Sequence, residues 1–173
     1  MTLRKAFLVI GAFLILIPFA SWAQETPQAE VFGGYSYIRT GTSSLNFNGF
    51  SSSVAGNVNN WLGVVADVGY YRSKVAGVSV NAVSYTFGPR FSYRSDAKVT
   101  PFFQTLFGGV RLSGGGVSDN AFAMTAGGGV DVNVSPAVAI RLAQAEYLMT
   151  RSSGTTENNF RFSAGVVFRI GKK

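Results

Sequence analysis

Residues 159–170 read NFRFSAGVVFRI, and their side chains alternate between two kinds. Every second residue is apolar, which makes one face of Phe160, Phe162, Ala164, Val166, Phe168 and Ile170. The residues between them are polar or small, apart from Val167. Successive side chains of a strand point to opposite faces, so a period of two predicts a β-strand with one apolar and one polar face. A helix would distribute the same residues around its whole surface.

The same pattern recurs upstream and predicts eight strands in all. Val83–Arg94 alternates as clearly as the last segment, although Pro89 has no N–H to donate and leads us to expect a local bulge there. Six further segments fit less cleanly: Glu30–Arg39, Gly49–Asn57, Trp61–Tyr71, Thr100–Val110, Ala121–Asn133 and Ala137–Arg151. Strict alternation in the last of these would place Gln144 and Glu146 on the apolar face. A one-residue bulge near Ala143 would return both to the polar face and put Tyr147 and Met149 outside.

The predicted connections alternate in length. Three are tight polar turns, at Asn59-Asn60, Ser95–Lys98 and Val134–Pro136. Four are longer and rich in Gly, Ser, Thr and Asn, at Thr40–Asn48, Arg72–Ser79, Ser113–Asn120 and Ser152–Asn158. This alternation is typical of an antiparallel up-and-down barrel whose two rims face different compartments. The fold class is therefore all-β, an eight-stranded antiparallel up-and-down transmembrane β-barrel.

The first 23 residues predict a cleavable signal peptide. Arg4 and Lys5 precede an apolar run from Ala6 to Ala20, and Ser21-Trp22-Ala23 supplies small residues before a cleavage point. A transmembrane anchor is the alternative, but the run is short for a spanning helix. We expect residues 24–29 to be a short lead-in and residues 30–173 to form the barrel domain.

Composition excludes several kinds of chemistry. The 173 residues include no Cys and no His, which rules out a disulfide framework, a thiol nucleophile, a Ser-His-Asp triad and an ordinary zinc site. The 15 Lys and Arg exceed the 8 Asp and Glu, but their scatter over many strands argues against a nucleic-acid groove. We expect no catalytic residue, no cofactor, no metal and no nucleic-acid partner.

Period two leaves open which face points inward. A soluble barrel carrying an apolar ligand would turn the apolar stripe inward, whereas a membrane barrel turns it outward. Export and a polar stripe poor in Lys and Glu favour the membrane. Aromatic residues near strand ends also suit interfacial girdles: Tyr35, Tyr37, Trp61, Tyr70, Tyr71, Tyr93, Tyr147 and Phe168. In lipid the barrel must close, because every backbone N–H and C=O needs a partner strand.

Several stretches resemble the eight-stranded outer-membrane β-barrel family, which includes the membrane half of outer membrane protein A. They are FGGYSYIR (32–39), GNVNNWLGVVADVGYY (56–71), YTFGPRFSYR (85–94), PFFQTLFGG (101–109) and FRFSAGVVFRI (160–170). The resemblance implies an assembly signal in the last strand, matched by Ser163, Gly165, Phe168 and Ile170, and hence the barrel-assembly machinery as a partner. The tail Gly171-Lys172-Lys173 departs from the family, in which many members end on an aromatic residue.

Charged residues on the polar stripe are candidates for an interior network. They are Glu30, Asp67, Arg90, Arg94, Asp131, Arg141, Glu146, Arg161 and Arg169. These groups either line a narrow selective pore or fill it, and eight strands enclose about enough room for side chains to fill. Buried charges must pair, so we expect Asp67 with Arg90, and Glu146 with Arg141 or Arg161.

A second group of cations falls near the predicted outer rim: Arg39, Arg72, Lys74, Arg111 and Arg151. They are candidates for contacts with lipopolysaccharide phosphates, and ordinary solvation of the rim is the alternative.

The sequence therefore predicts a small, non-enzymatic, monomeric barrel of the cell outer membrane. Its partners would be outer-membrane lipid and lipopolysaccharide, and its role envelope integrity, with at most a narrow, charge-lined pore. One alternative is a surface-recognition, adhesin-like barrel that acts through loops Thr40–Asn48 and Ser113–Asn120. A second is the soluble periplasmic carrier of an apolar ligand.

Overall fold

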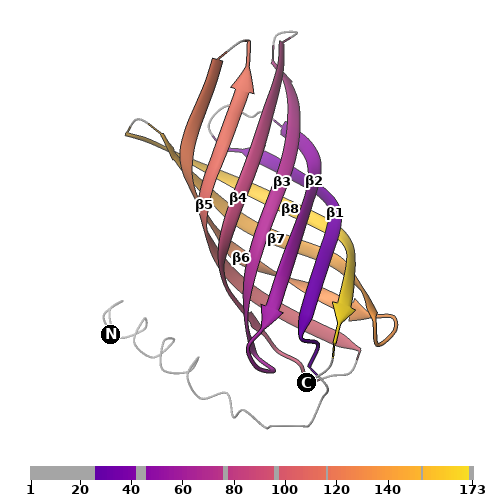
Figure 1. Ribbon diagram of the computed structural model, residues 1–173. Coiled ribbons are helices and arrows are strands. Elements are labelled where there is room, and N and C mark those ends of the chain that lie inside the picture. The colour runs from indigo at the N-terminus through magenta and orange to yellow at the C-terminus, as the bar shows by residue number, and fades with distance from the viewer. Residues whose placement is uncertain are drawn as a thin grey trace, which may run out of the picture.

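The computed structural model describes residues 26–41, 46–75, 78–95, 98–115, 117–152 and 154–171, so the expected signal peptide lies outside the described residues. Eight strands form one closed barrel in which each strand pairs antiparallel with its neighbours in the chain (Figure 1). Their bounds are β1 Ala29–Thr40, β2 Asn46–Asn57, β3 Leu62–Val75, β4 Val78–Ser92, β5 Val99–Gly114, β6 Val117–Asn133, β7 Val138–Ser152 and β8 Thr155–Ile170. No helix within these ranges is long and apolar enough to cross a membrane.

The two ends of the barrel differ. One end, here the hairpin end, carries the connections β1–β2, β3–β4, β5–β6 and β7–β8. The other, the turn end, carries the other three connections and the first and last residues of the barrel. In Figure 1 the hairpins β3–β4 and β5–β6 rise at the top of the view, and the chain leaves β8 at the bottom.

The apolar stripe faces outward and the polar stripe faces inward, as predicted for a membrane barrel. Phe50 and Phe87 on the outer face are 71% and 65% exposed, whereas Asp67 and Arg161 on the inner face are each 2% exposed. The pattern of β2 is a strict alternation of exposed and buried residues along its whole length. The period-two prediction of two unlike faces is therefore confirmed, and with it the assignment of inside and outside.

The strands are longer at the hairpin end than the sequence analysis predicts. The prediction of long loops is wrong at three of the four positions: Arg72–Ser79, Ser113–Asn120 and Ser152–Asn158. Most of these residues extend the strand pairing instead, as far as Val75↔Val78, Gly114↔Val117 and Ser152↔Thr155. Polar composition suggested loops, but the ladder is made by backbone N–H and C=O groups, so polar side chains do not prevent its extension. The strands of 12 to 17 residues exceed the roughly 9–11 that cross a hydrocarbon layer.

The two predicted bulges have opposite outcomes. The bulge at Pro89 is wrong: β4 and β5 keep one register from Phe87↔Phe107 to Arg90↔Gln104, and the ladder only omits the pairs between them. The bulge near Ala143 is confirmed, because the β7–β8 register shifts between Arg141 and Gln144. Beyond it Gln144 and Glu146 are buried, and Tyr147 on the outer face is 40% exposed.

Barrel closure depends on two glycines that face each other where β1 meets β8. Gly34 and Gly165 are paired, and a Cβ on Gly165 would lie 2.3 Å from the carbonyl oxygen of Gly33. A Cβ on Gly34 would lie 2.2 Å from the carbonyl oxygen of Ala164. Side chains at this pair would push β1 and β8 apart, so the pairing between the first and last strands needs residues without a Cβ here.

We therefore expect Gly165→Ala to destabilise the folded barrel by about 1–3 kcal/mol, the usual range for overpacking. Urea titration in lipid vesicles, read by the shift between folded and unfolded bands on an unheated gel, measures the loss. Gly33→Ala is the matched control on the same pairing, because a Cβ there meets nothing within 4 Å. Equal stability of the two variants would contradict the requirement for glycine where β1 pairs with β8.

Candidate functional site

Arg161 lies at the centre of the barrel interior and holds two carboxylates. Its Nη1 is 2.7 Å from Asp67 Oδ1, and its Nη2 is 2.6 Å from Glu146 Oε2. Glu146 is the cross-strand neighbour of Arg161 on β7, whereas Asp67 reaches it from β3. All three side chains are at most 2% exposed. The contact therefore joins opposite parts of the barrel wall through the lumen.

A second set of contacts extends this cluster toward the turn end. Gln104 donates its Nε2–H to Glu146 Oε1 at 2.9 Å and accepts a hydrogen bond from Arg90 Nε at 2.9 Å. Arg90 Nη1 lies 3.6 Å from Glu30 Oε2, and the guanidinium carbon is 4.7 Å from the ring centre of Phe102. The amide of Gln104 therefore connects an anion to a cation that do not touch each other.

Arg141 forms a third buried group. Its Nε and Nη2 donate to the two oxygens of Asp131 at 2.7 and 2.9 Å, and its Nη1 donates to Gln144 Oε1 at 2.9 Å. The guanidinium lies between two rings, 4.4 Å from the centre of Phe32 and 4.3 Å from that of Phe102. A bidentate pair with aromatic faces on the cation is a strong arrangement for a guanidinium out of water.

Glu30 closes the network at the turn end. Besides Arg90, its carboxylate lies 3.1 Å from Arg94 Nη2 and 3.8 Å from Arg169 Nε. Glu30 itself is 4% exposed. One carboxylate at the end of the lumen thus faces three cations, and each buried charge in the network has a partner of opposite sign that offsets part of its desolvation cost.

The pairings differ in part from those that the sequence analysis proposes. Glu146 pairs with Arg161, one of its two candidate partners, but the expected Asp67–Arg90 pair is wrong because Asp67 contacts Arg161. The roles of Gln104, Phe32 and Phe102 were missed. All three alternate onto the inner face of their strands, so period two places them in the lumen, but it carries no information on contacts across it.

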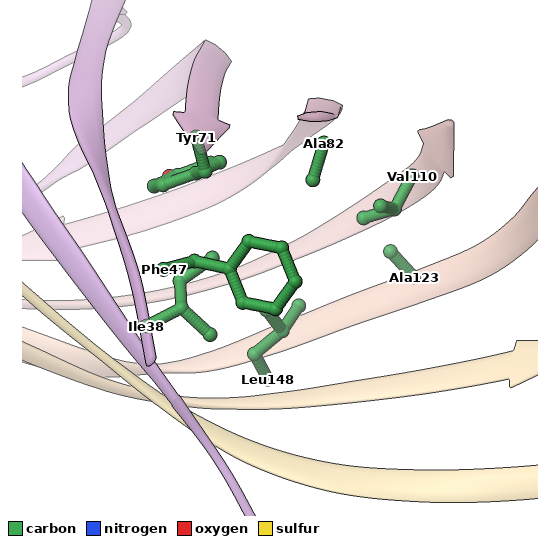
Figure 2. Packing of buried hydrophobic residues seen from close by; sticks show 7 residues of the cluster. All are labelled: Ile38, Phe47, Tyr71, Ala82, Val110, Ala123 and Leu148. Carbon is green, nitrogen blue, oxygen red and sulfur yellow. The ribbon is translucent and has the colours of Figure 1, made fainter. Parts of the chain in front are cut away.

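Above Arg161, toward the hairpin end, the interior becomes apolar. Tyr71 marks the boundary, and its expected place in an outer aromatic girdle is wrong because the side chain points inward and is fully buried. Its phenol accepts a hydrogen bond from Arg161 Nη1 at 3.3 Å. Beyond it a buried cluster draws side chains from seven strands toward one centre (Figure 2): Ile38, Phe47, Tyr71, Ala82, Val110, Ala123 and Leu148. A cavity of about 340 Å³ lies against this cluster, and Asp119 and Glu157 also line it. We call this space the mouth cavity.

The outer surface at the hairpin end carries a repeated polar contact. The hydroxyl of a tyrosine on an odd-numbered strand donates a hydrogen bond to an asparagine Oδ1 on the next strand, at distances between 2.5 and 3.1 Å. The four pairs are Tyr35–Asn48, Tyr37–Asn46, Tyr70–Asn81 and Tyr147–Asn158. The rim cations predicted from the sequence are all exposed on the outer face of this end of the barrel: Arg39, Arg72, Lys74, Arg111 and Arg151.

The four residues of the expected assembly signal lie on the turn-end half of β8. Ser163 points inward, with its Oγ 2.7 Å from that of Ser36, and Gly165 forms the seam with β1. Phe168 and Ile170 point outward and are 54% and 57% exposed. Two residues of the set thus serve barrel closure, and two are presented on the outer surface. Across the described ranges, no group of acidic residues is arranged to hold a metal ion.

No protein-family model matches the chain, and no curated protein matches its sequence. Several solved structures share its fold. Neisserial surface protein A is 19% identical with a TM-score of 0.69, covering 85% of this chain and 99% of its own. Outer membrane protein OprG of Pseudomonas aeruginosa is 6% identical with a TM-score of 0.59, covering 85% and 97%. Ail, the attachment invasion locus protein of Yersinia pestis, is 20% identical with a TM-score of 0.52, covering 82% and 99%. The resemblance to eight-stranded outer-membrane β-barrels is thus confirmed for the fold.

Proposed function

We propose that this chain is a non-enzymatic outer-membrane barrel with a closed lumen, which contributes to the integrity of the envelope. The observation that carries the proposal is the cluster of Asp67, Glu146 and Arg161, whose side chains meet in the middle of the barrel and are almost fully buried. Ions crossing the barrel would have to displace a set of mutually paired charges. The network therefore supports a plug rather than a charge-lined pore.

The outer surface supports a place in the membrane. Its apolar side chains cover the barrel wall, and a large exposed apolar surface is unfavourable in water but matches a hydrocarbon layer. The soluble carrier required the apolar stripe to line the interior, and the structure places it outside. We propose that residues 1–23 act as the signal peptide for export. The barrel-assembly machinery then inserts the chain by recognising the signal formed by Ser163, Gly165, Phe168 and Ile170. The inserted barrel works as a monomer.

The hairpin end supports contact with anionic lipid headgroups, and we propose that it faces the outside of the cell. The Tyr–Asn pairs place phenol rings beside the apolar band and polar groups above it, which suits the boundary between acyl chains and headgroups. The rim cations lie on the outer face at the same end, and Arg72 is the cross-strand neighbour of both Asn48 and Asn81. Cations at this boundary are suited to contacts with lipopolysaccharide phosphates.

The surface-recognition alternative has less structural support. It depended on long loops at Thr40–Asn48 and Ser113–Asn120, and the second of these is almost entirely strand, with Arg111↔Asn120 and Gly114↔Val117 both in the ladder. A hairpin tip of this size offers little surface for a partner. Ail has been solved in complex with the heparin analogue sucrose octasulfate, but this binding is a property of Ail. At 21% identity, its likeness to this chain concerns the fold alone.

Planar-bilayer recording tests the closed lumen. We expect no stable conductance steps from the folded wild-type barrel. The triple variant Asp67→Ser, Glu146→Ser and Arg161→Ser removes the whole cluster without leaving an unpaired member, and we expect it to conduct ions. An unheated gel establishes that both proteins are folded. Stable steps from the wild type, or a folded triple variant as silent as the wild type, would contradict the proposal.

A further inference from the structure

The mouth cavity is apolar at its base. Phe47, Val110 and Leu148 come from three different strands and are buried together on the inner face of the barrel. Apolar side chains on the inner face of a membrane barrel do not serve contact with lipid. They also do not fill the space completely, because about 340 Å³ remains open against them. This volume lies at the lower end of the range of about 300–1,000 Å³ typical of small-molecule sites.

The charges around the cavity are segregated by sign. Among the described residues that line it, the charged side chains are two carboxylates, Asp119 on β6 and Glu157 on β8. The cations at this end of the barrel lie on its outer face instead, as Arg111 and Arg151 show. Asp119 is held in place, because its Oδ2 accepts a hydrogen bond of 2.8 Å from Ser152 Oγ on β7. The cavity entrance is therefore negative in a chain whose net charge is +7.

The base of the cavity is closed to longer molecules. Tyr71 is fully buried there and accepts a hydrogen bond from Arg161, which is in turn held by Asp67 and Glu146. A ligand that enters from the hairpin end would meet apolar walls, then an aromatic ring, and would not reach the paired charges. The space thus suits a short apolar group whose polar end stays at the entrance.

We propose that the mouth cavity binds small cationic amphiphiles. The apolar part of the ligand packs against Phe47, Val110 and Leu148, and its ammonium group lies at the carboxylates of Asp119 and Glu157. Binding at this site is compatible with a closed lumen, because the ligand enters and leaves at the hairpin end without crossing the barrel. Anionic amphiphiles of the same length are excluded by the two carboxylates, so the sign of the headgroup determines selectivity.

Calorimetric titration with hexyltrimethylammonium and hexanoate tests the proposal. The folded protein is held in zwitterionic phospholipid nanodiscs, and titrations into protein-free nanodiscs are subtracted. We expect the cation to bind at least about tenfold more tightly than the anion, the difference expected when a charge meets two partners at a partly hydrated entrance. Equal affinity for the two probes, or no heat above the protein-free discs, would overturn the proposal.

Three variants separate the two halves of the site. Asp119→Asn with Glu157→Gln keeps the shape and should lower affinity for the cation about tenfold and remove the preference for it. Ala121→Phe fills the cavity and should lower affinity by at least as much. Arg151→Gln is the matched control, because it changes a charge on the outer face at the same end and should leave binding unchanged. A double amide variant that binds the cation like the wild type would overturn the assignment of the carboxylates.

Discussion

Replacing Arg161 with methionine should destabilise the folded barrel by about 3–5 kcal/mol, the cost of breaking a buried ion pair by removing one partner. The reason is that Arg161 neutralises two carboxylates at once, Asp67 at 2.7 Å and Glu146 at 2.6 Å. Without the guanidinium both would remain buried side by side with no cation between them. Urea unfolding in lipid vesicles, followed by tryptophan fluorescence, measures the loss.

Two further variants isolate the electrostatic part of this effect. Arg151→Met changes an exposed arginine on the outer face and should alter stability by no more than about 0.5 kcal/mol. The triple variant Asp67→Asn, Glu146→Gln and Arg161→Met removes all three charges and should recover most of the lost stability, because no buried charge is left unpaired. If the triple variant is as unstable as Arg161→Met alone, packing around the side chain and not its charge holds this region together.

Phe87→Arg should cost about 2–4 kcal/mol, the penalty for a cation on the lipid face near the middle of the bilayer. Phe87 is 65% exposed and points away from the barrel. On the outer face of β4 it lies between Asn81, which pairs with Tyr70 at the hairpin end, and Phe91, which stacks on Trp61 at the turn end. The penalty arises only if acyl chains cover this face, since an exposed arginine in water costs almost nothing.

Val83→Arg is the matched substitution, on the same strand and the same face. Val83 is the cross-strand neighbour of Arg111, so a cation there joins the rim and should cost only about 0–1 kcal/mol. Equilibrium unfolding of the two variants in vesicles gives both numbers. Equal and negligible costs at both positions would show that water, and not lipid, covers the wall of the barrel.

Local chemistry predicts part of this structure well. Period two identifies the strands because each side chain points either into the lumen or toward the outside. Its polarity must match whichever of these two environments it meets. The bulge near Ala143 follows from the same rule, since without it Glu146 would face outward. Pro89 shows the limit: a missing N–H weakens a ladder, but the paired residues on either side hold the register without a bulge.

Strand ends and contacts across the lumen were harder to predict. Polar residues such as Ser113 and Ser118 fit a loop or a paired strand equally well, and pairing decides between them only once the neighbouring strand is in place. The Asp67–Arg161 contact joins residues 94 positions apart. It depends on how far each strand is staggered against the next around the whole barrel, and no short stretch of sequence contains that information.

The Tyr–Asn pairs have a consequence for how the protein sits in different bilayers. Each phenol of these pairs already donates a hydrogen bond to an asparagine of the same chain, so it does not need a glycerol or sugar oxygen as an acceptor. The asparagine amide keeps its own N–H groups for whatever headgroup is near. The depth at which the barrel sits in the bilayer then depends on the protein rather than on the headgroup chemistry. We expect the same depth whether the surrounding leaflet is made of phospholipid or of glycolipid.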